Sequence, residues 1–322
     1  MERQIQSTIV IPNYNGIKYI ENCLRSLEGE PAHIIVVDNG STDGSRQIVQ
    51  DKFPQVTLIG LDSNYGFCKA VNTGIDNSKT TYVILLNNDT EVEKGFVRAL
   101  EGSLEQHPEV FSGSAQMRNL HHPELIDDAG DFYCALGWAF ARGKDKPFAN
   151  YRQRRRIFAA CGGAAIYRRK VFDEIGCMDE NHFAYLEDID LGYRARLHGY
   201  DNLYVPEAVV YHAGSGASGS RYNDFKVGLT SRNSVYLVYK NMPLIQVILN
   251  LPFLFAGFAI KTLFFIKKGF GLTYIKGLCQ GAALCLSEEG RARRVRFDRD
   301  RLYSYIVIQL ELWRNIWYRL AG

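Results

Sequence analysis

The sequence predicts an α/β fold in which helices cover both faces of a mainly parallel β-sheet. Three observations predict it. From residue 8 to about residue 110, short β-branched runs alternate with amphipathic helical segments. Polar clusters follow three of the expected strands. The composition, 46% hydrophobic and 23% charged over 322 residues, is that of a globular chain long enough for one large domain and an appendage. Strands that alternate with helices in this way form parallel sheets.

The expected elements follow one another in a simple order. Strands are expected at Thr8–Ile11, His33–Val37, Val56–Ile59, Tyr82–Leu86 and near Val110. Helices are expected at Ile17–Leu27, up to about Phe53, at Phe67–Asn77 and around Leu100. Residues 118–156 mix Gly, Pro and charge, which predicts a long connection or small antiparallel hairpins over the site. A strand at Ala159–Tyr167, a helix at Glu187–His198 and a strand at Leu203–Tyr211 complete the domain.

Three polar clusters lie where expected strands end. They are Asn13–Asn15, Asp38–Ser41 and Asn87–Asp89. In open parallel sheets, ligands bind beyond the carboxyl ends of the strands. The sequence therefore predicts that these clusters meet at one edge of the sheet and form a binding site there.

Two segments contain candidate metal ligands. Asn87–Asp89 ends a buried strand, and a carboxylate in this position holds Mg²⁺ or Mn²⁺ together with substrate phosphates. A turn with a helix cap before Glu91 is the alternative. His212 ends a strand and enters a Gly/Ser-rich segment. Its imidazole suits Mn²⁺ better than Mg²⁺, and a polar core or surface histidine is the alternative.

Three acidic residues, Glu187, Asp188 and Asp190, open an expected helix. The helix dipole favours negative charge in a first turn, so plain N-terminal acids are one interpretation. Leucine and isoleucine alternate with these acids, which indicates that some of the carboxylates face a crowded site. A carboxylate held in place is the group needed to remove a proton from an attacking hydroxyl.

Seven motifs occur in a fixed order along the chain. They read IPNYNG, VVDNGSTDGS, NYGFCKAVNTGI, LLNNDT, CGGAAIYRR, FAYLEDIDLGYRARLHGY and VPEAVVYH. This succession resembles the family-2 glycosyltransferases, and within them the bacterial rhamnosyltransferase-like group, from about Thr8 to Asn233. The resemblance implies a GT-A nucleotide-diphospho-sugar transferase fold, a mainly parallel mixed sheet flanked by helices, for residues 1–240.

The resemblance also implies a nucleotide-diphosphate sugar as donor. Tyr14 is then expected to stack on a pyrimidine base, and Asp38 to accept a hydrogen bond from the base N3–H. Asn64, Gly66 and Asn72 match the segment that lines the ribose and diphosphate. The full donor-binding set implied in this way is Pro12, Tyr14, Asn15, Asp38, Asn64, Gly66, Asn72, Asn87 and Asn88.

A divalent cation, Mn²⁺ or Mg²⁺, is implied as cofactor. Asp89 occupies the position of the family's metal ligand in its DxD motif, and His212 matches a histidine that completes the metal site in some relatives. The first acid of that motif is replaced here by Asn87. An amide supplies no charge, so the resemblance implies a weaker metal affinity.

The implied reaction is a single in-line displacement that inverts the anomeric centre. Asp188 matches the family's general base, beside Glu187, and Asp190 is the rival for that role. Gly162, Gly163 and Asp190 are expected on the acceptor side, the two glycines in a strand that lets the acceptor approach the backbone. The expected donor is dTDP-rhamnose or a UDP-sugar. The expected acceptor is a hydroxyl of a saccharide or lipid-linked saccharide in cell-surface polysaccharide assembly.

Two other functions stay open. A processive polysaccharide synthase is disfavoured because such enzymes carry a QxxRW motif, whereas Gln309 is followed here by Leu-Glu-Leu-Trp. A catalytically silent sugar-nucleotide-binding or scaffold protein is kept open by Asn87. The joint presence of Asp89, Asp188 and His212 argues against it.

Residues 241–322 are expected to form a helical, apolar and basic extension that associates with membranes. Leu244–Ile266 is long enough to span a bilayer. Its interior Lys261 and Pro252 also fit an interfacial helix, and a buried helix of a soluble bundle is a third possibility. The last helix, Arg301–Leu320, is rich in Tyr and Trp, which favour the headgroup region.

Charge and cysteine content indicate where the protein works. Six arginines fall within the eleven residues from Arg291 to Arg301. Such a cluster is attracted to an anionic membrane surface and marks the cytoplasmic side, although a solvated basic face is the plainer interpretation. The seven cysteines form no CxxC pair and fit reduced cytosolic thiols. The net charge of +3 is too small to indicate nucleic-acid binding. We therefore expect a cytoplasmic protein, peripheral or monotopic at the inner face of the plasma membrane.

Overall fold

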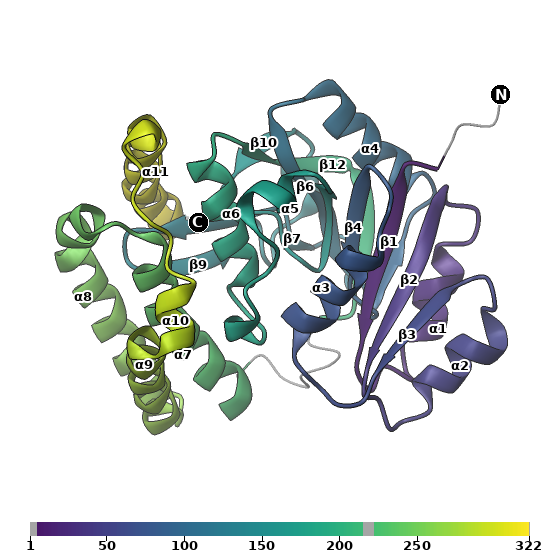
Figure 1. Cartoon of the computed structure of the whole chain (residues 1–322), viewed down its shortest axis with the longest axis horizontal. Coiled ribbons are helices and arrows are strands. Elements are labelled where there is room, and N and C mark those ends of the chain that lie inside the picture. Colours follow the sequence, from purple (N-terminus) through teal and green to yellow (C-terminus); the bar gives the residue numbers. More distant parts are fainter. Residues whose placement is uncertain (1–4, 215–221, 322) are drawn as a thin grey trace.

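The computed structural model describes residues 5–214 and 222–321. Most of the expected Gly/Ser-rich segment after His212, residues 215–221, lies outside the described residues. Figure 1 shows a central sheet with a separate group of C-terminal helices on the side away from β3.

A mixed sheet of ten strands forms the centre of the described chain. Its main path is β10-β12-β6-β11-β4-β1-β2-β3, with β5 paired to β12 and β7 to β6. The strands are β1 (Ser7–Asn13), β2 (Ala32–Asn39), β3 (Thr57–Leu61), β4 (Tyr82–Leu86), β5 (Thr90–Val92), β6 (Val110–Asn119), β7 (Ile126–Asp128), β10 (Arg155–Ile157), β11 (Ala164–Arg168) and β12 (Asp201–His212). The pairs β1–β2, β1–β4, β2–β3 and β6–β12 are parallel, whereas β11 runs antiparallel to both of its neighbours. The predicted mainly parallel mixed sheet is therefore confirmed.

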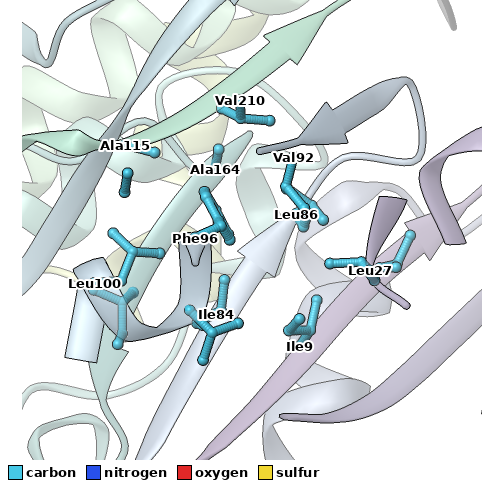
Figure 2. Packing of buried hydrophobic residues seen from close by; sticks show 14 of the residues in the cluster. Ile9, Leu27, Ile84, Leu86, Val92, Phe96, Leu100, Ala115, Ala164 and Val210 are labelled. Carbon is cyan, nitrogen blue, oxygen red and sulfur yellow. The ribbon is translucent and has the colours of Figure 1, made fainter. Parts of the chain in front are cut away.

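Helices cover both faces of this sheet, as predicted. They are α1 (Ile20–Ser26), α2 (Ser45–Lys52), α3 (Phe67–Asn77), α4 (Phe96–Gln106), α5 (Val171–Ile175) and α6 (Glu187–Leu197). Side chains alternate across a strand, so Ile9 and Ile11 of β1 enter one hydrophobic cluster and Val10 enters the other. Figure 2 shows the first cluster, in which Ile9, Ile84 and Phe96 meet between β1, β4 and α4.

Two expectations about the middle of the chain have different outcomes. The small hairpins predicted within residues 118–156 are present, as β6–β7 and as β8 (Asp131–Cys134) with β9 (Trp138–Ala141). The strand predicted at Ala159–Tyr167 begins only at Ala164. Ahead of it Ala164 donates its N–H to the Cys161 carbonyl, which makes Gly162 and Gly163 part of a turn rather than a strand.

The C-terminal helices share a core with the rest of the protein. They are α7 (Asp224–Asn241), α8 (Leu244–Lys267), α9 (Gly271–Leu286), α10 (Glu288–Ala292) and α11 (Leu302–Ala321). Tyr305, Ile308 and Leu312 of α11 lie in one buried cluster with Phe132 and Tyr193 of the preceding domain. The extension is thus packed onto the sheet domain through apolar side chains rather than joined to it only by a linker.

Helix α8 has one polar side and one apolar side. Its buried Gln246 accepts a hydrogen bond from the Tyr193 hydroxyl (2.6 Å), and its buried Asn250 bonds with Gln309 (2.9 Å). Leu251 and Phe255, by contrast, are exposed. Among the described residues, α8 is the one helix long and apolar enough to cross a membrane, a criterion of length and composition alone.

A buried ionic cluster joins α6 to α7. The Asp190 carboxylate lies 2.9 Å from both the Arg194 guanidinium and the Lys240 ammonium, and Lys240 also contacts Asp179 at 2.8 Å. Although burial opposes its charge, Arg194 and Lys240 hold the pKa of Asp190 far below its usual range. His182 is buried beside these groups, and burial lowers its pKa to about 4.

We predict that His182 makes the fold less stable in mild acid. Its folded pKa of about 4 lies below the value of about 6.5 in the unfolded chain, so between these values only the unfolded chain binds the proton. The contribution of His182 to the free energy of unfolding should therefore fall by about 1.4 kcal/mol per pH unit as the pH drops through this window. Buried carboxyl groups with a raised pKa, such as Glu187, act in the opposite direction, so denaturant titrations at pH 7 and pH 5 must compare proteins with and without His182.

Between pH 7 and pH 5, His182→Phe should gain stability relative to the unsubstituted protein, because the aromatic contact with Tyr236 is kept and the titrating group is gone. The exposed His33→Gln is the matched control and should behave as the unsubstituted protein does. An equal pH dependence in His182→Phe and the unsubstituted protein would refute the prediction.

Candidate active site

A cleft of about 1720 Å³ opens at the carboxyl ends of β1 and β4. The β8–β9 hairpin and the last turn of α11 form its far wall. Twelve of the residues predicted for the site line it, namely Pro12, Tyr14, Asn64, Gly66, Asn87, Asn88, Asp89, Gly162, Gly163, Glu187, Asp188 and His212. The structure therefore brings most of the predicted site residues into one continuous space.

Asp38 and Asn15 do not line the cleft, and their side chains form hydrogen bonds within the loops beside it. Asp38 is buried and accepts hydrogen bonds from the Asn13 amide (3.0 Å) and the Ser41 N–H (3.2 Å). Asn15 accepts one from the Thr42 N–H (2.9 Å). These contacts tie the loop after β1 to the loop after β2, and donor binding by these two side chains stays a prediction.

Asn72 and Asp190 are also absent from the cleft wall. The Asn72 amide donates to the Met178 carbonyl (2.8 Å) and accepts from the Met178 N–H (3.1 Å), so it clamps a loop. Asp190 is fully buried in the ionic cluster with Arg194 and Lys240. Both side chains are already bonded to partners inside the protein, and the donor and acceptor roles expected for Asn72 and Asp190 stay predictions.

Gly66 allows a close contact between two backbone segments that line the cleft. It has φ +88°, and an added Cβ would lie 2.6 Å from the Phe183 carbonyl oxygen. Asn64 accepts a hydrogen bond from the Gly66 N–H (3.0 Å) and another from the Asn39 amide (2.9 Å). Tyr14 lies at the mouth of this region with 41% of its surface exposed, where its ring face is open to a ligand.

Asp89 and His212 lie side by side because β5 pairs with β12. Thr90 is in register with His212, and the Ala213 N–H donates to the Asp89 carbonyl at 3.0 Å. The His212 Nε2 atom is 3.2 Å from the Asp89 carboxylate, and its Nδ1 atom is 2.8 Å from the Asp127 carboxylate. One carboxylate oxygen and one imidazole nitrogen thus converge from two strands.

This pair has the chemistry of a cation site. Burial disfavours the charged imidazole, but hydrogen bonds to Asp127 and Asp89 outweigh it and raise the pKa of His212 to about 10. An excess of negative charge therefore surrounds the ring. Oxygen and imidazole ligands suit Mn²⁺, and a carboxylate on the other ring nitrogen is the usual way to orient such a histidine. No sequence motif predicted Asp127, which lies within the irregular segment of residues 118–156.

Asp188 belongs to a group of carboxyl groups in the middle of the cleft. It is partly buried and accepts a hydrogen bond from the Ile189 N–H (2.7 Å). Its carboxyl is in hydrogen-bonding contact with that of Asp131, and Asp128 lies beside Asp131. Burial raises the pKa of Asp188 and of Asp131, and raises that of Asp128 to about 7.

Glu187 stands next to this group. Burial and the neighbouring Asp188 raise the pKa of Glu187 to about 8, and its Oε2 atom has no hydrogen-bond partner among the described residues. A neutral carboxylic acid beside a carboxylate can donate a hydrogen bond, so at neutral pH the group contains both donors and an acceptor. Asp128 and Asp131 gave no recognisable signal in the sequence.

The turn that presents Asp188 has an unusual backbone. Phe183, Tyr185 and Leu186 all have positive φ, between 62° and 72°. Non-glycine residues in this region cost about 1–3 kcal/mol each and persist where surrounding contacts hold them, commonly at functional sites. The amide of Asn233 supplies such contacts, because it donates to the carbonyls of His182 (2.9 Å), Ala184 (2.9 Å) and Tyr185 (2.8 Å).

Solved structures share this architecture. GalNAc-T7 with UDP, GalNAc and Mn²⁺ superposes with a TM-score of 0.59 at 18% identity, covering 74% of this chain and 48% of that one. Residues 1–349 of S. aureus TarS in complex with UDP superpose with a TM-score of 0.55 at 17% identity, covering 98% and 92%. The chain therefore has the predicted GT-A fold of glycosyltransferases that use nucleotide sugars.

Residues 8–176, more than half of the chain, match the profile of Glycosyl transferase family 2. The chain belongs to this family, and it transfers a sugar from a nucleotide sugar. One similar relative is the N-acetylglucosaminyl-diphospho-decaprenol L-rhamnosyltransferase of Mycobacterium tuberculosis. It is 27% identical over 239 residues, 66% of this chain and 77% of the relative. The resemblance to the rhamnosyltransferase-like group is thereby confirmed.

We predict that Asn233→Ala lowers catalytic activity more than it lowers stability. The substitution removes the amide that donates to the Ala184 and Tyr185 carbonyls, whereas the His182 carbonyl keeps the Arg232 guanidinium (3.0 Å) and the Ala184 N–H (2.7 Å) as donors. An unsatisfied buried group costs about 1–3 kcal/mol. With the turn relaxed, kcat for sugar transfer should fall about tenfold or more, while nucleotide binding is kept.

Thermal unfolding, nucleotide titration and steady-state kinetics measure the three quantities on one preparation. Asn77→Ala is the control, since it removes an exposed amide that donates only to a carbonyl of its own helix. Unchanged kcat in a folded Asn233→Ala protein would show that the turn needs no such support.

Proposed function

We propose that the protein is an inverting transferase that moves one sugar onto a hydroxyl of a lipid-linked saccharide. The observation that carries this proposal is the arrangement of the cleft. Asp89 and His212 stand at its donor end, and Asp188 projects into the middle of the same cleft. A leaving group held at the first position and a hydroxyl held at the second would allow an in-line attack.

The chemical step follows from these positions. Asp188 accepts the proton of the acceptor hydroxyl as that oxygen forms a bond to the anomeric carbon. The bond from the anomeric carbon to the diphosphate oxygen breaks, and the nucleoside diphosphate leaves with the electron pair. One displacement from the opposite face inverts the anomeric centre. Glu187 and Asp131, neutral through their raised pKa, are placed to donate hydrogen bonds around the base.

Asp89 and His212 are the residues that would hold Mn²⁺ or Mg²⁺. The bound cation would supply positive charge that stabilises the leaving diphosphate. The neighbour GalNAc-T7 contains Mn²⁺ together with UDP, which supports a metal requirement here. Asn87 lines the cleft without adding charge, and we expect a weaker affinity for the cation than a second carboxylate would give.

The donor and acceptor are proposed from the relative and from the cleft. The M. tuberculosis relative is a rhamnosyltransferase acting on a diphospho-decaprenol-linked sugar, which supports dTDP-rhamnose as donor and a polyprenol-linked acceptor. UDP-sugars are the second donor class. Tyr14 and the turn at Gly66 offer a face for the base and a backbone for the diphosphate.

The proposed division of labour places catalysis in residues 1–240 and membrane attachment in residues 241–322. The exposed apolar side of α8 and the exposed Trp317 of α11 support contact with a membrane. Cytoplasmic attachment at the inner face of the plasma membrane is supported by the arginines between Arg291 and Arg301, which attract anionic lipid.

Asp188→Asn is the direct test of the base. General base catalysis contributes about 10²–10⁴-fold, so kcat should fall by that order while nucleotide binding stays the same. Transfer from dTDP-rhamnose and from UDP-sugars to a polyprenyl-diphosphate-linked sugar is measured with Mn²⁺ and after chelation, with thermal stabilisation by each nucleotide. Asp173→Asn, an exposed aspartate of α5, is the matched control.

Near-normal turnover in Asp188→Asn would disprove the assignment of the base. Stabilisation by a nucleotide without transfer to any acceptor would support a silent sugar-nucleotide-binding protein instead. Stabilisation by one pyrimidine diphosphate, enhanced by the cation, together with transfer would establish the donor class.

Asp131 is proposed as a positioning residue that keeps Asp188 ionised. Burial raises the pKa of Asp188, and the hydrogen bond from Asp131 opposes this rise. Activity should therefore increase with pH as Asp188 loses its proton, with an apparent pKa above that of an ordinary aspartate. Asp131→Ala removes the donor and should move this acid limb of kcat/KM upward by about one pH unit or more.

Asp131→Asn retains a donor to Asp188, and its acid limb should stay close to that of the unsubstituted enzyme. This rescue separates positioning from a purely structural role, which would lower activity without moving the pH profile. An acid limb that stays in place in Asp131→Ala would refute the proposed role.

A further inference from the structure

Three arginines form a patch on the wall of the cleft that also includes β8, β9 and α11. They are Arg142 after β9, Arg155 in β10 and Arg319 in the last turn of α11, and all three line the cleft. We call them the arginine patch. Arg319 comes from the last helix, far in the sequence from Arg142 and Arg155, so only the folded chain brings all three to one wall.

The arginine patch has no carboxylate partner within ion-pair distance in the described part of the chain. The neighbours of Arg155 in β10 are different, since Arg154 pairs with Glu207 (3.2 Å) and Arg156 with Asp201 (3.0 Å). Arg155, the middle residue of Arg154–Arg156, thus lines the cleft without a carboxylate partner among the described residues. Arg142 has a buried Nη1 atom without a hydrogen-bond partner in the same part of the chain.

Aromatic rings support the patch from behind. The Arg155 guanidinium lies 4.8 Å from the centre of the Tyr318 ring, that of Arg142 lies 4.7 Å from Tyr151, and that of Arg319 lies 5.8 Å from Phe140. A guanidinium stacked on a ring keeps its N–H groups free along its edge, the geometry in which arginine binds phosphate.

The charges of the patch act on one another. Burial lowers the pKa of Arg142, and the positive charge of Arg155 lowers it further. Asp128 partly offsets these effects on Arg142 without forming an ion pair with it. A ligand that carries negative charge would stabilise the three cations further. The structure therefore offers a site for an anion with several oxygen atoms.

The patch begins next to the proposed base. Asp131, whose carboxyl contacts that of Asp188, is followed directly by Phe132, and Arg155 lies over the Phe132 ring at 5.8 Å. The backbone of Arg142 is hydrogen-bonded to Ala129 and Gly130, in the turn that also carries Asp128. Asp188 and the arginine patch thus lie along the same cleft and are connected through β8 and the turn before it.

Helix α11, which carries Arg319, also has exposed apolar side chains. Trp317 is 74% exposed and Leu320 is 70% exposed, while the adjacent Tyr318 and Arg319 line the cleft. An apolar chain attached to a phosphate at the patch would leave the cleft along this exposed side. The donor diphosphate has its own place at Asp89 and His212, so the arginine patch is not needed for it.

We infer that the arginine patch binds the diphosphate of the acceptor, a saccharide joined through a diphosphate to a long apolar chain. The inference rests on the proposed function, because it takes the attacking hydroxyl to lie at Asp188. It adds a defined recognition site for the phosphate groups, formed jointly by the sheet domain and the extension.

The test compares two acceptors that carry the same sugar. One is linked through a diphosphate to a polyprenyl chain, and the other is an alkyl glycoside without phosphate. In Arg155→Gln and Arg319→Gln, KM for the diphosphate acceptor should rise about tenfold or more, since each substitution removes a charge-assisted hydrogen bond. KM for the alkyl glycoside and stabilisation by the donor nucleotide should not change.

Arg156→Gln is the matched control, because this arginine is exposed on the same strand and paired with Asp201. The inference is overturned if both acceptors lose activity equally, or if neither does in variants that keep their melting temperature. Sedimentation with phosphatidylglycerol vesicles without acceptor distinguishes the other source of phosphate. A loss of vesicle binding equal to the loss of transfer would assign the patch to lipid headgroups instead.

A binding measurement keeps the inference testable if the enzyme transfers to neither acceptor. Calorimetric titration with a short prenyl diphosphate is performed on the full chain with the donor site filled by dTDP. Binding that Arg155→Gln weakens about tenfold and Arg156→Gln does not would support the arginine patch, even if the proposed reaction failed. Equal binding by all three proteins would overturn it.

Discussion

The position of Asp188 depends on the ionic cluster beneath α6. Asp190, two residues further along the helix, is fixed by Arg194 and by Lys240 of α7. Removing one partner of such a pair leaves an uncompensated buried charge, which costs about 3–5 kcal/mol. With α6 anchored, the strained turn before it has one fixed end, and Asn233 of the same α7 holds the turn itself. The buried structural carboxylate of Asp190 and the proposed base Asp188 thus share one helical turn.

The C-terminal extension, residues 241–322, contributes side chains both to the cleft and to the buried core. The side chain of Asn315 in α11 donates to the Tyr133 carbonyl of β8 at 2.9 Å, and the Ala135 N–H donates to the Leu312 carbonyl at 3.0 Å. These bonds lock α11 to the hairpin that forms the far wall of the cleft. The sheet domain alone would contain the donor end but would lack part of the wall on the acceptor side.

Sequence patterns predicted the alternation of strands and helices well, because the periods of Ile9–Ile11 in a strand and of Leu100–Leu104 in a helix are local properties. Motif resemblance also predicted roles for Asp89, Asp188 and His212, and the structure places all three on the wall of one cleft. The resemblance favoured Asp188 over Asp190 as the base. Helix geometry gives a physical reason, because residues two apart in a helix differ by about 200° in direction and so face opposite sides. Arg319 was beyond any local pattern, since its place in the cleft depends on contacts with segments nearly two hundred residues away.

The two faces of α11 have a kinetic consequence. If Trp317 and Leu320 rest on a bilayer, a water-soluble donor reaches the cleft by diffusion in three dimensions, whereas a lipid-anchored acceptor arrives by lateral diffusion within the leaflet. The quantity that saturates the acceptor site is then its mole fraction in the membrane rather than its concentration in the whole volume. Adding inert lipid at constant acceptor would slow the enzyme by surface dilution, and successive transferases on one leaflet would pass intermediates along without releasing them to water.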